Sequence, residues 1–467
     1  MSSTGEHSDE AKAQAGNDSR DDEYRRWVEA TPPAVEPFYP FRAPNESIPL
    51  YAGQLRGTAK AGEVVVDGAI ETAFQPTLRL RYKSTEELPP RLALEFFAAD
   101  VDFDLFPADV SRLPVPPQPI DENRTPPVEG YLLQLEMGAA DRLAFMTFQL
   151  PNFLPFIGDW IRHEGHLTRG RLVLSGGGWR ITIDSREGLD DIVASVKRSG
   201  GYALTHVGRL EREDGALFEL SHGQLMIDAI YRFCSFVNGF ATGPLLPVGF
   251  VGAGQAVWSD WRPIVADPWH SVDSWADALH PNELTNLFPR FLNRWLDPYW
   301  QRVVNAGIAF YLDANVPRTL QRAIVLAQIG LELLVYAVLV DEQHVGAQDI
   351  KPIGVGIARL LDHYKISTVI PKHFTELADL ASSNGWATGP WAVTALRNEF
   401  VHAKRATPVR PYKVWLQAWK LISWYLELAL LATFGFNGEY MNRLNWPRRP
   451  GTVEPVPWAV AGARPPA

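Results

Sequence analysis

Cysteine is almost absent from this chain of 467 residues, in which Cys234 is the single example. One cysteine forms neither an internal disulfide nor a thiolate cage for a metal ion. The N-terminal residues also lack the basic segment followed by an apolar stretch that marks a secretory signal. These absences predict a protein of the reducing cytoplasm.

A surplus of positive charge is missing as well. Lys and Arg together number 44 against 54 Asp and Glu, which gives a formal net charge of −10. Such a chain does not coat nucleic acid through its overall charge. Any contact with RNA would therefore need a local basic patch.

Long uncharged apolar runs are absent too. Residues 324–340 and 421–436 come closest, but each contains a glutamate, Glu332 and Glu427 respectively. Both are shorter than the roughly 20 residues that cross a bilayer, and a charge inside the bilayer is costly. We expect two buried helices of a soluble bundle and no membrane partner.

Sequence signatures of cofactor and metal sites are also lacking. The glycines at 252–254 and 354–356 are not followed by the further glycine or the Gly-Lys-Ser/Thr sequence of phosphate-binding loops. His163 and His166 are three residues apart, whereas a zinc metalloprotease helix has its two histidines four apart. We therefore expect no cofactor and no metal.

The N-terminal half of the chain reads as a β-rich domain. Residues 1–37 are rich in small and acidic residues and are expected to form a disordered tail. Residues 38–265 contain short alternating runs and predict an antiparallel sandwich or barrel of sensing or regulatory type. Strands are expected at 63–66, 78–82, 91–97 and 131–136, with a glycine-turned hairpin at 169–184 and one helix at 222–238.

The C-terminal half has the 3.6-residue period of helices. The predicted fold class is therefore α+β, with the β-rich domain followed by an all-α bundle over residues 266–446. A flexible Pro-rich tail is expected at 447–467. The expected helices are 282–295, 297–312, 317–340, 354–364, 373–382, 390–404 and 412–434.

Four tryptophans lie in the connector between these halves: Trp258, Trp261, Trp269 and Trp275. Such a cluster packs an interface or binds a ligand or an RNA base, and we favour packing.

The most informative segment is residues 396–402, Leu-Arg-Asn-Glu-Phe-Val-His. On a helix, Asn398 and His402 share one face and Arg397 lies on its flank. An imidazole moves protons near neutral pH, and a guanidinium stabilises a pentavalent phosphate. RNA supplies its own 2′-hydroxyl nucleophile, so this set suffices for metal-free cleavage. The alternative is that Arg397 only packs its stem against apolar neighbours.

Placed on the penultimate long helix of the C-terminal half, this segment resembles the motif of HEPN ribonucleases, an Arg, a polar residue that is often Asn, and a His. The resemblance covers about residues 281–445, and the layout is similar to that of ApeA-like antiphage proteins. It implies that Arg397, Asn398 and His402 are catalytic, that the helical domain forms a homodimer, and that the substrate is RNA. It also implies conditional cleavage in antiviral defence by abortive infection, with a phage-derived activator.

One position departs from a HEPN subtype. Toxins silenced by a nucleotidyltransferase partner carry a tyrosine two residues after the histidine, where this chain has Lys404. An antitoxin of that type is therefore not expected.

Supporting roles fall to residues around the motif. Glu332, in an apolar helix, is expected to pair with Arg397, unless it faces an edge or pairs with another arginine. Glu399 either tunes His402 or is exposed, and we favour exposure. A basic cluster after the motif is expected to form an RNA-binding track. The alternative is that its members are solvated residues at a helix end. The cluster consists of Lys404, Arg405, Arg410 and Lys413.

Two other functions remain open. In one, the helical domain is a non-catalytic HEPN dimerisation module, and the β domain binds a ligand or a partner. In the other, a carbohydrate-binding or unrelated β domain is joined to a helical assembly module.

Overall fold

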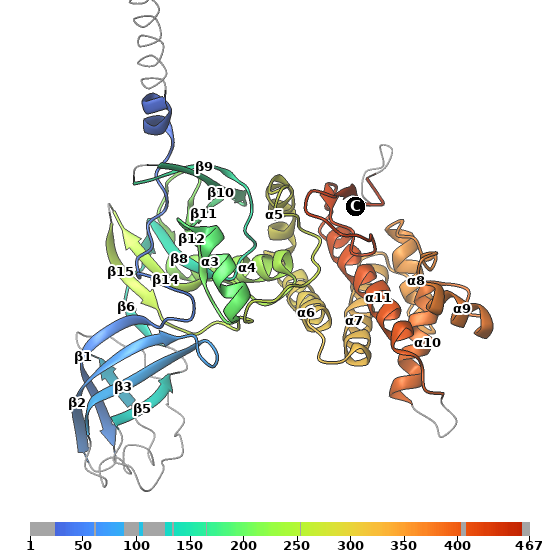
Figure 1. Cartoon of the computed structure of the whole chain (residues 1–467), viewed down its shortest axis with the longest axis horizontal. Coiled ribbons are helices and arrows are strands. Elements are labelled where there is room, and N and C mark those ends of the chain that lie inside the picture. Colours follow the sequence, from blue (N-terminus) through green and yellow to red (C-terminus); the bar gives the residue numbers. More distant parts are fainter. Residues whose placement is uncertain are drawn as a thin grey trace, which may run out of the picture.

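The computed structural model describes residues 24–459 except 60–61, 88–101, 106–126, 133–134, 165, 253 and 403–407. Figure 1 shows two sheets at one end of the molecule and a bundle of helices at the other. The predicted α+β class, with antiparallel sheets before a helical region, is confirmed. The predicted strand at 91–97 lies outside the described residues.

The larger sheet has eight strands, and every neighbouring pair is antiparallel. In spatial order these are β6 (Glu136–Gly138), β15 (Gln255–Asp260), β14 (Leu245–Val251), β8 (Phe145–Pro151), β12 (Leu204–Arg212), β11 (Trp179–Ser185), β10 (His166–Gly176) and β9 (Asp159–His163).

The predicted hairpin is confirmed as β10 and β11, with Gly176 opposite Trp179. The two residues between them, Gly177 and Gly178, have φ of 57° and 74°. A two-residue hairpin turn with both residues at positive φ is the type whose twist matches the strands, and glycine adopts it without a steric penalty.

Side chains alternate across this sheet. On β8, β11 and β12, one set of side chains is apolar and buried in the main core, for example Met146, Ile181 and Leu210. The alternate positions carry polar groups, among them Thr147, Thr182 and Arg209. The helices cover the apolar face, and the polar face is the opposite one (Figure 1).

The smaller sheet has five antiparallel strands. Its order is β4 (Asp102–Leu105), β1 (Ile48–Ala59), β2 (Gly62–Ala73), β3 (Arg79–Glu87) and β5 (Pro127–Leu132). A separate apolar cluster that includes Ile70, Leu80 and Trp261 packs this sheet against β14. The remaining strands form two-stranded pairs: β7 (Arg142–Leu143) with β13 (Phe218–Glu219), and β16 (Glu439–Tyr440) with β17 (Glu454–Pro455).

Helices α3 (Leu189–Ser199) and α4 (Leu220–Asn238) lie within the β-rich half, and α3 has no counterpart in the sequence prediction. The helical half comprises α5 (Asn282–Trp295), α6 (Pro298–Asn315), α7 (Leu320–Leu334), α8 (Ile353–His363), α9 (Thr375–Asn384), α10 (Gly389–Val401) and α11 (Tyr412–Thr433). All the helices expected there are present. A π-helix, η1 (Val335–Glu342), continues α7 directly.

Side-chain caps fix the start of several of these helices. The Asp297 carboxylate accepts hydrogen bonds from the amides of Tyr299 and Trp300 at the start of α6, and the Thr319 hydroxyl accepts one from Arg322 at the start of α7. Thr388 caps α10 in the same way, before Pro390. Each cap satisfies amides that have no partner within the helix.

The apolar core runs without a break from the eight-stranded sheet through α4 into helices α5 to α11. Trp258, Trp261 and Trp275 are buried, which confirms that these connector tryptophans pack, whereas Trp269 is half-buried. The predicted boundary between residues 265 and 266 therefore lies in a connector that both halves pack against.

Among the described residues, one helical segment, Leu320–Glu342, has the length and apolar composition to cross a membrane, and most of it is buried inside the protein. It contains the first of the two apolar runs found in the sequence. The second run lies in α11, in which nearly every residue after Lys420 is buried.

The prediction of disordered tails needs correction where the structure describes them. Residues 24–30 are helical, and Pro33 bridges to Arg162 of β9. At the other end, Val456 and Trp458 are buried, and the Trp458 indole donates to the Phe436 carbonyl. Composition alone missed these anchors because a few apolar side chains suffice to hold a polar segment against a core. Residues 1–23 and 460–467 lie outside the described residues.

Candidate functional site

The predicted catalytic residues lie at the C-terminal end of α10. The first part of this helix is buried, with Ala392, Val393 and Leu396 facing α7, α8 and α11. From residue 397 to residue 402 every side chain is half-buried or exposed. The motif is therefore carried on a helix end that reaches past the bundle into solvent.

Within the motif, the Arg397 Nη1 donates to the Asn398 Oδ1 at 3.1 Å. The Arg397 Nε is buried and has no hydrogen-bond partner among the described residues. His402 is exposed and is the C-cap of the helix, with its backbone amide donating to the Asn398 carbonyl at 2.9 Å. The helix was predicted to continue to residue 404, but it ends at Val401.

The predicted pairing of Glu332 with Arg397 is wrong. Glu332 accepts a hydrogen bond from Gln328 Nε2 at 2.9 Å, one turn earlier on α7, and makes no ion pair among the described residues. The Gln328 side chain is fully buried. The half-buried Glu332 is therefore satisfied within its own helix, which sequence spacing did not suggest.

Two of the four predicted RNA-binding residues are neutralised by carboxylates. The Arg410 guanidinium holds Glu399 through two hydrogen bonds of 3.0 and 2.8 Å, and this contact raises the pKa of Arg410. Glu399 is thus half-buried in an ion pair, whereas exposure was expected. Lys413 pairs with Glu376 at 3.0 Å and lowers the pKa of Glu376 to about 2. Lys404 and Arg405 lie outside the described residues.

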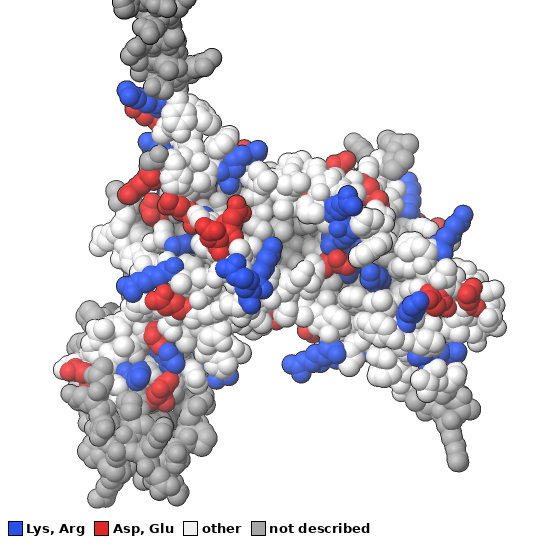
Figure 2. Space-filling model, viewed as in Figure 1, with Lys and Arg blue, Asp and Glu red and all other residues white. Residues whose placement is uncertain are grey.

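Basic side chains do not gather into one track on the visible face of the helical half. Figure 2 shows Lys and Arg interspersed with Asp and Glu there. This face of the helical half therefore presents no continuous basic track for an RNA backbone.

The bidentate Glu399–Arg410 pair fastens the segment before α11 to the end of α10. Its side chains are 23% and 16% exposed, so the pair is shielded more than a surface ion pair. A double-mutant cycle with Glu399→Ala and Arg410→Ala should give a coupling free energy of about 1 kcal/mol in thermal unfolding. Additive effects of the two substitutions would show that the pair holds nothing in place.

Exposed apolar side chains lie on α10 and on the segment that follows the motif. They are Trp391, Phe400, Val401, Val409 and Tyr412. Trp391 lines an open 830 Å³ cavity between α8 and the first turn of α10. Phe400, Val401, Val409 and Tyr412 lie close to the motif in the sequence, and exposed apolar groups of this kind are typical of interaction surfaces.

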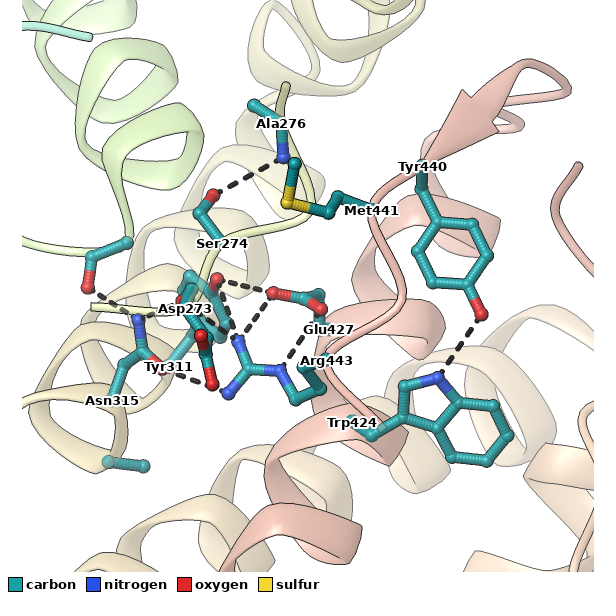
Figure 3. Close-up of polar contacts among 12 residues, drawn as sticks. Asp273, Ser274, Ala276, Tyr311, Asn315, Trp424, Glu427, Tyr440, Met441 and Arg443 are labelled. Carbon is teal, nitrogen blue, oxygen red and sulfur yellow. Dashed lines mark hydrogen bonds and ion pairs between the residues drawn. The ribbon is translucent and has the colours of Figure 1, made fainter. Parts of the chain in front are cut away.

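The helical half contains a buried ion pair that was not predicted from the sequence (Figure 3). Glu427 of α11 and Arg443 are 0% and 1% exposed. The Arg443 Nε donates to Glu427 Oε1 at 3.1 Å, and Nη2 donates to Oε2 at 2.5 Å. Burial opposes the charge on Arg443, but the Glu427 carboxylate outweighs it and raises the pKa of Arg443.

Two further side chains and two backbone carbonyls complete this network. The Tyr311 hydroxyl of α6 donates to Glu427 Oε2 at 2.6 Å, and Arg443 Nη1 donates to the Asn315 Oδ1 at 2.9 Å. The Asn315 amide donates to the carbonyls of Gly239 and Asp273 at 2.8 Å each. The end of α4, the connector, α6, α11 and the C-terminal segment thus meet at one satisfied polar cluster, a structural clamp without access from solvent.

A cavity of 470 Å³ lies where α5, α6, α8 and the end of α11 meet. The Arg294 guanidinium stacks 4.0 Å from the Trp300 ring centroid and donates to Glu342, the last residue of the π-helix, at 3.1 Å. His363 also lines the cavity, and partial burial lowers its pKa. These residues lie outside the motif on α10, and no sequence pattern joined them.

The fold defines an α+β protein in which antiparallel sheets precede a helical domain that carries an exposed Arg-Asn-x-x-x-His segment. Residues 139–272 match the family model described as the YopA central domain, and residues 297–454 match the YopA C-terminal domain model. The first match contains most of the eight-stranded sheet, and the second contains α10. Neither description mentions a HEPN domain.

The chain is also similar to the SPbeta prophage-derived uncharacterized protein YopA of Bacillus subtilis (strain 168). The two are 27% identical over 424 residues, which cover 89% of this chain and 95% of the relative. The similarity therefore extends through both halves of the chain. No solved structure matches it.

Proposed function

We propose that this protein is a metal-independent endoribonuclease of HEPN type, and that it acts conditionally in antiphage defence from the cytoplasm. The observation that carries the proposal is the position of Arg397, Asn398 and His402 together on the solvent-reachable end of α10. A guanidinium and an imidazole at one exposed site are what cleavage by the RNA 2′-hydroxyl requires.

The roles follow from the chemistry of the three side chains. His402 removes the proton of the 2′-hydroxyl or donates one to the leaving 5′-oxygen, because an imidazole can both accept and donate a proton. Arg397 binds the phosphorane, for which its planar fork is suited. Asn398 accepts a hydrogen bond from Arg397 and orients it. The proposed mechanism uses neither a metal nor a cofactor.

A homodimer is part of the proposal. One motif presents a single Arg397 and a single His402 at the exposed end of α10. A second copy seated on the exposed apolar side chains around α10 would bring two motifs together and bury Trp391, Phe400 and Val401. The RNA substrate would then lie across the shared cleft, where water is partly excluded.

Conditional activity is also part of the proposal. What supports a link to phage is the relative's description as prophage-derived. An activator supplied by an infecting phage would act on the β-rich half, which packs directly on the helices through the shared core.

The proposal is tested in cells. We expect expression of the wild type, resting or challenged by phage, to degrade cellular RNA, and His402→Ala and Arg397→Ala to leave RNA intact. His373→Ala and Arg322→Ala are matched controls, because both residues are exposed in the helical half and neither belongs to the motif. All variants should keep the wild-type circular dichroism spectrum. Phage protection that survives both motif substitutions would sink the ribonuclease proposal.

The second candidate is a non-catalytic assembly module with a ligand- or partner-binding β-rich half. The pairing of Arg410 and Lys413 with carboxylates favours it, because these two residues are then not available to RNA. It predicts a dimer that cleaves no RNA and a phenotype that does not depend on His402.

A further inference from the structure

The polar face of the eight-stranded sheet carries a cavity that nothing above assigns. Its volume is 630 Å³, within the range of small-molecule sites. The floor comes from β8, β10, β11, β12 and β14, and the N-terminal segment Pro32 to Phe38 forms the roof. Figure 1 shows this segment, in blue, running along the sheet before it reaches β1.

The roof is anchored to the sheet rather than lying loosely on it. The Val35 amide donates to Asp184 Oδ2 at 2.8 Å, and Arg171 Nη2 donates to the Pro33 carbonyl at 2.7 Å. Arg171 and Asp184 also form a shielded ion pair of 2.6 Å. These contacts set the height of the cavity before any ligand enters, so little ordering free energy is lost on binding.

The floor presents hydrogen-bond donors in a row. Thr147, Arg209 and Thr182 are directly opposite one another on the adjacent strands β8, β12 and β11, and all three line the cavity. The Arg209 Nε donates to Glu211 at 2.8 Å. Its two Nη groups and both threonine hydroxyls have no hydrogen-bond partner among the residues that the structure describes.

A stack of planar groups holds Arg209 in place. Its guanidinium carbon lies 3.7 Å from the centroid of the Phe145 ring, which stacks on Phe250 at 4.6 Å with an interplanar angle of 10°. Phe38 of the roof meets Phe250 edge to face and stays half exposed. The stacking restrains the guanidinium, and Arg209 lines the cavity.

We propose that this cavity binds a nucleoside monophosphate or a molecule of the same chemistry. Its anionic group would accept from Arg209 Nη and from the hydroxyls of Thr147 and Thr182, because a guanidinium fork and two hydroxyls match phosphate oxygens. Its flat ring would lie against Phe38 and the prolines of the roof. Glu36, an exposed carboxylate of the roof, would accept from the base or the ribose.

Such a site places a small-molecule input in the half of the chain that does not carry the α10 motif. The floor strands bury their other face in the core that continues into α4 and the helical bundle. The inference does not depend on the ribonuclease proposal, since binding is measured without any RNA substrate.

The test is calorimetric titration of the full chain with the monophosphates AMP, GMP, CMP and UMP, and separately with adenosine, with phenyl phosphate and with inorganic phosphate. We expect at least one monophosphate to bind and Arg209→Gln to weaken it about tenfold or more, the effect of losing a charge-assisted hydrogen bond. Arg180→Gln is the matched control, because Arg180 is exposed on β11, outside the cavity lining. It should leave affinity unchanged.

Each other result contradicts the proposal. No heat with any monophosphate at millimolar concentration would overturn it, as would equal binding by Arg209→Gln. If inorganic phosphate binds as tightly as the nucleotides, Phe38 and the prolines of the roof do not bind the ring. If adenosine is the one compound that binds, Arg209 and the two threonines do not form an anion site. Thr182→Val provides a second variant if Arg209→Gln does not keep the wild-type unfolding temperature, and it too should weaken binding.

Discussion

Glu427→Ala should lower the free energy of unfolding by about 3–5 kcal/mol, the loss expected when one partner of a buried ion pair is removed. The substitution leaves the Arg443 guanidinium uncompensated at 1% exposure, and it removes the acceptor of the Tyr311 hydroxyl. Thermal or denaturant unfolding followed by circular dichroism measures the effect. Glu46→Ala, at an exposed position, should change stability by no more than about 0.5 kcal/mol.

The double variant Glu427→Leu/Arg443→Met sharpens this prediction. Replacing a buried ion pair with apolar side chains of similar volume is often neutral for stability, because both desolvation costs disappear together. We expect the double variant to recover most of the stability that Glu427→Ala loses. A double variant as unstable as the single one would show that packing at these positions matters more than charge.

The largest expected effect on activity is that of His402→Ala. Removing a general acid or base should lower the rate of RNA cleavage by about 10²- to 10⁴-fold. Stability should change little, because the imidazole is exposed and its side chain has no hydrogen bond among the described residues. The measurement is the cleavage rate of a defined RNA by purified wild type and variant.

Asn398→Ala should have a smaller effect on the same rate. Asn398 accepts a hydrogen bond from Arg397 and takes no direct part in the proposed proton transfers. A rate for Asn398→Ala as low as that for His402→Ala would give Asn398 a direct role in the chemistry. If His402→Ala cleaves RNA at the wild-type rate, the imidazole has no direct role in the chemistry.

Helices and the hairpin could be predicted from local sequence patterns. The expected helix 282–295 coincides with α5, and the hairpin turn follows from its glycines, because periodicity and turn chemistry are properties of neighbouring residues. The π-helix after α7 could not be predicted in this way. It extends an apolar helix whose sequence shows no break, so its register is set by packing around it.

Contacts between distant residues were the part that the sequence did not reveal. Glu332 and Arg397 looked like natural partners, yet Glu332 is satisfied by Gln328 on its own helix. Arg410 and Lys413 looked like a basic track until the fold brought Glu399 and Glu376 to them. Charge counts along a chain do not show which charges the fold pairs.

The site residues themselves were named from spacing and resemblance, and the structure adds where they lie. All three lie at the C-terminal end of α10, where Asn398 and His402 are exposed and Arg397 is half-buried. The row of Thr147, Arg209 and Thr182 could not be found in the sequence, because the three come from strands that only the sheet register aligns.

The chemistry of the RNA ends tests the ribonuclease proposal most directly. Purified wild type, with a chelator present, should cut a defined RNA to leave 2′,3′-cyclic phosphate and 5′-hydroxyl ends, and should not cut the same sequence with a 2′-deoxy residue at the cleavage site. His402→Ala should give neither product. Ends with a free 3′-hydroxyl, or cleavage that the chelator abolishes, would contradict a metal-independent attack by the 2′-hydroxyl and with it the role given to Arg397 and His402.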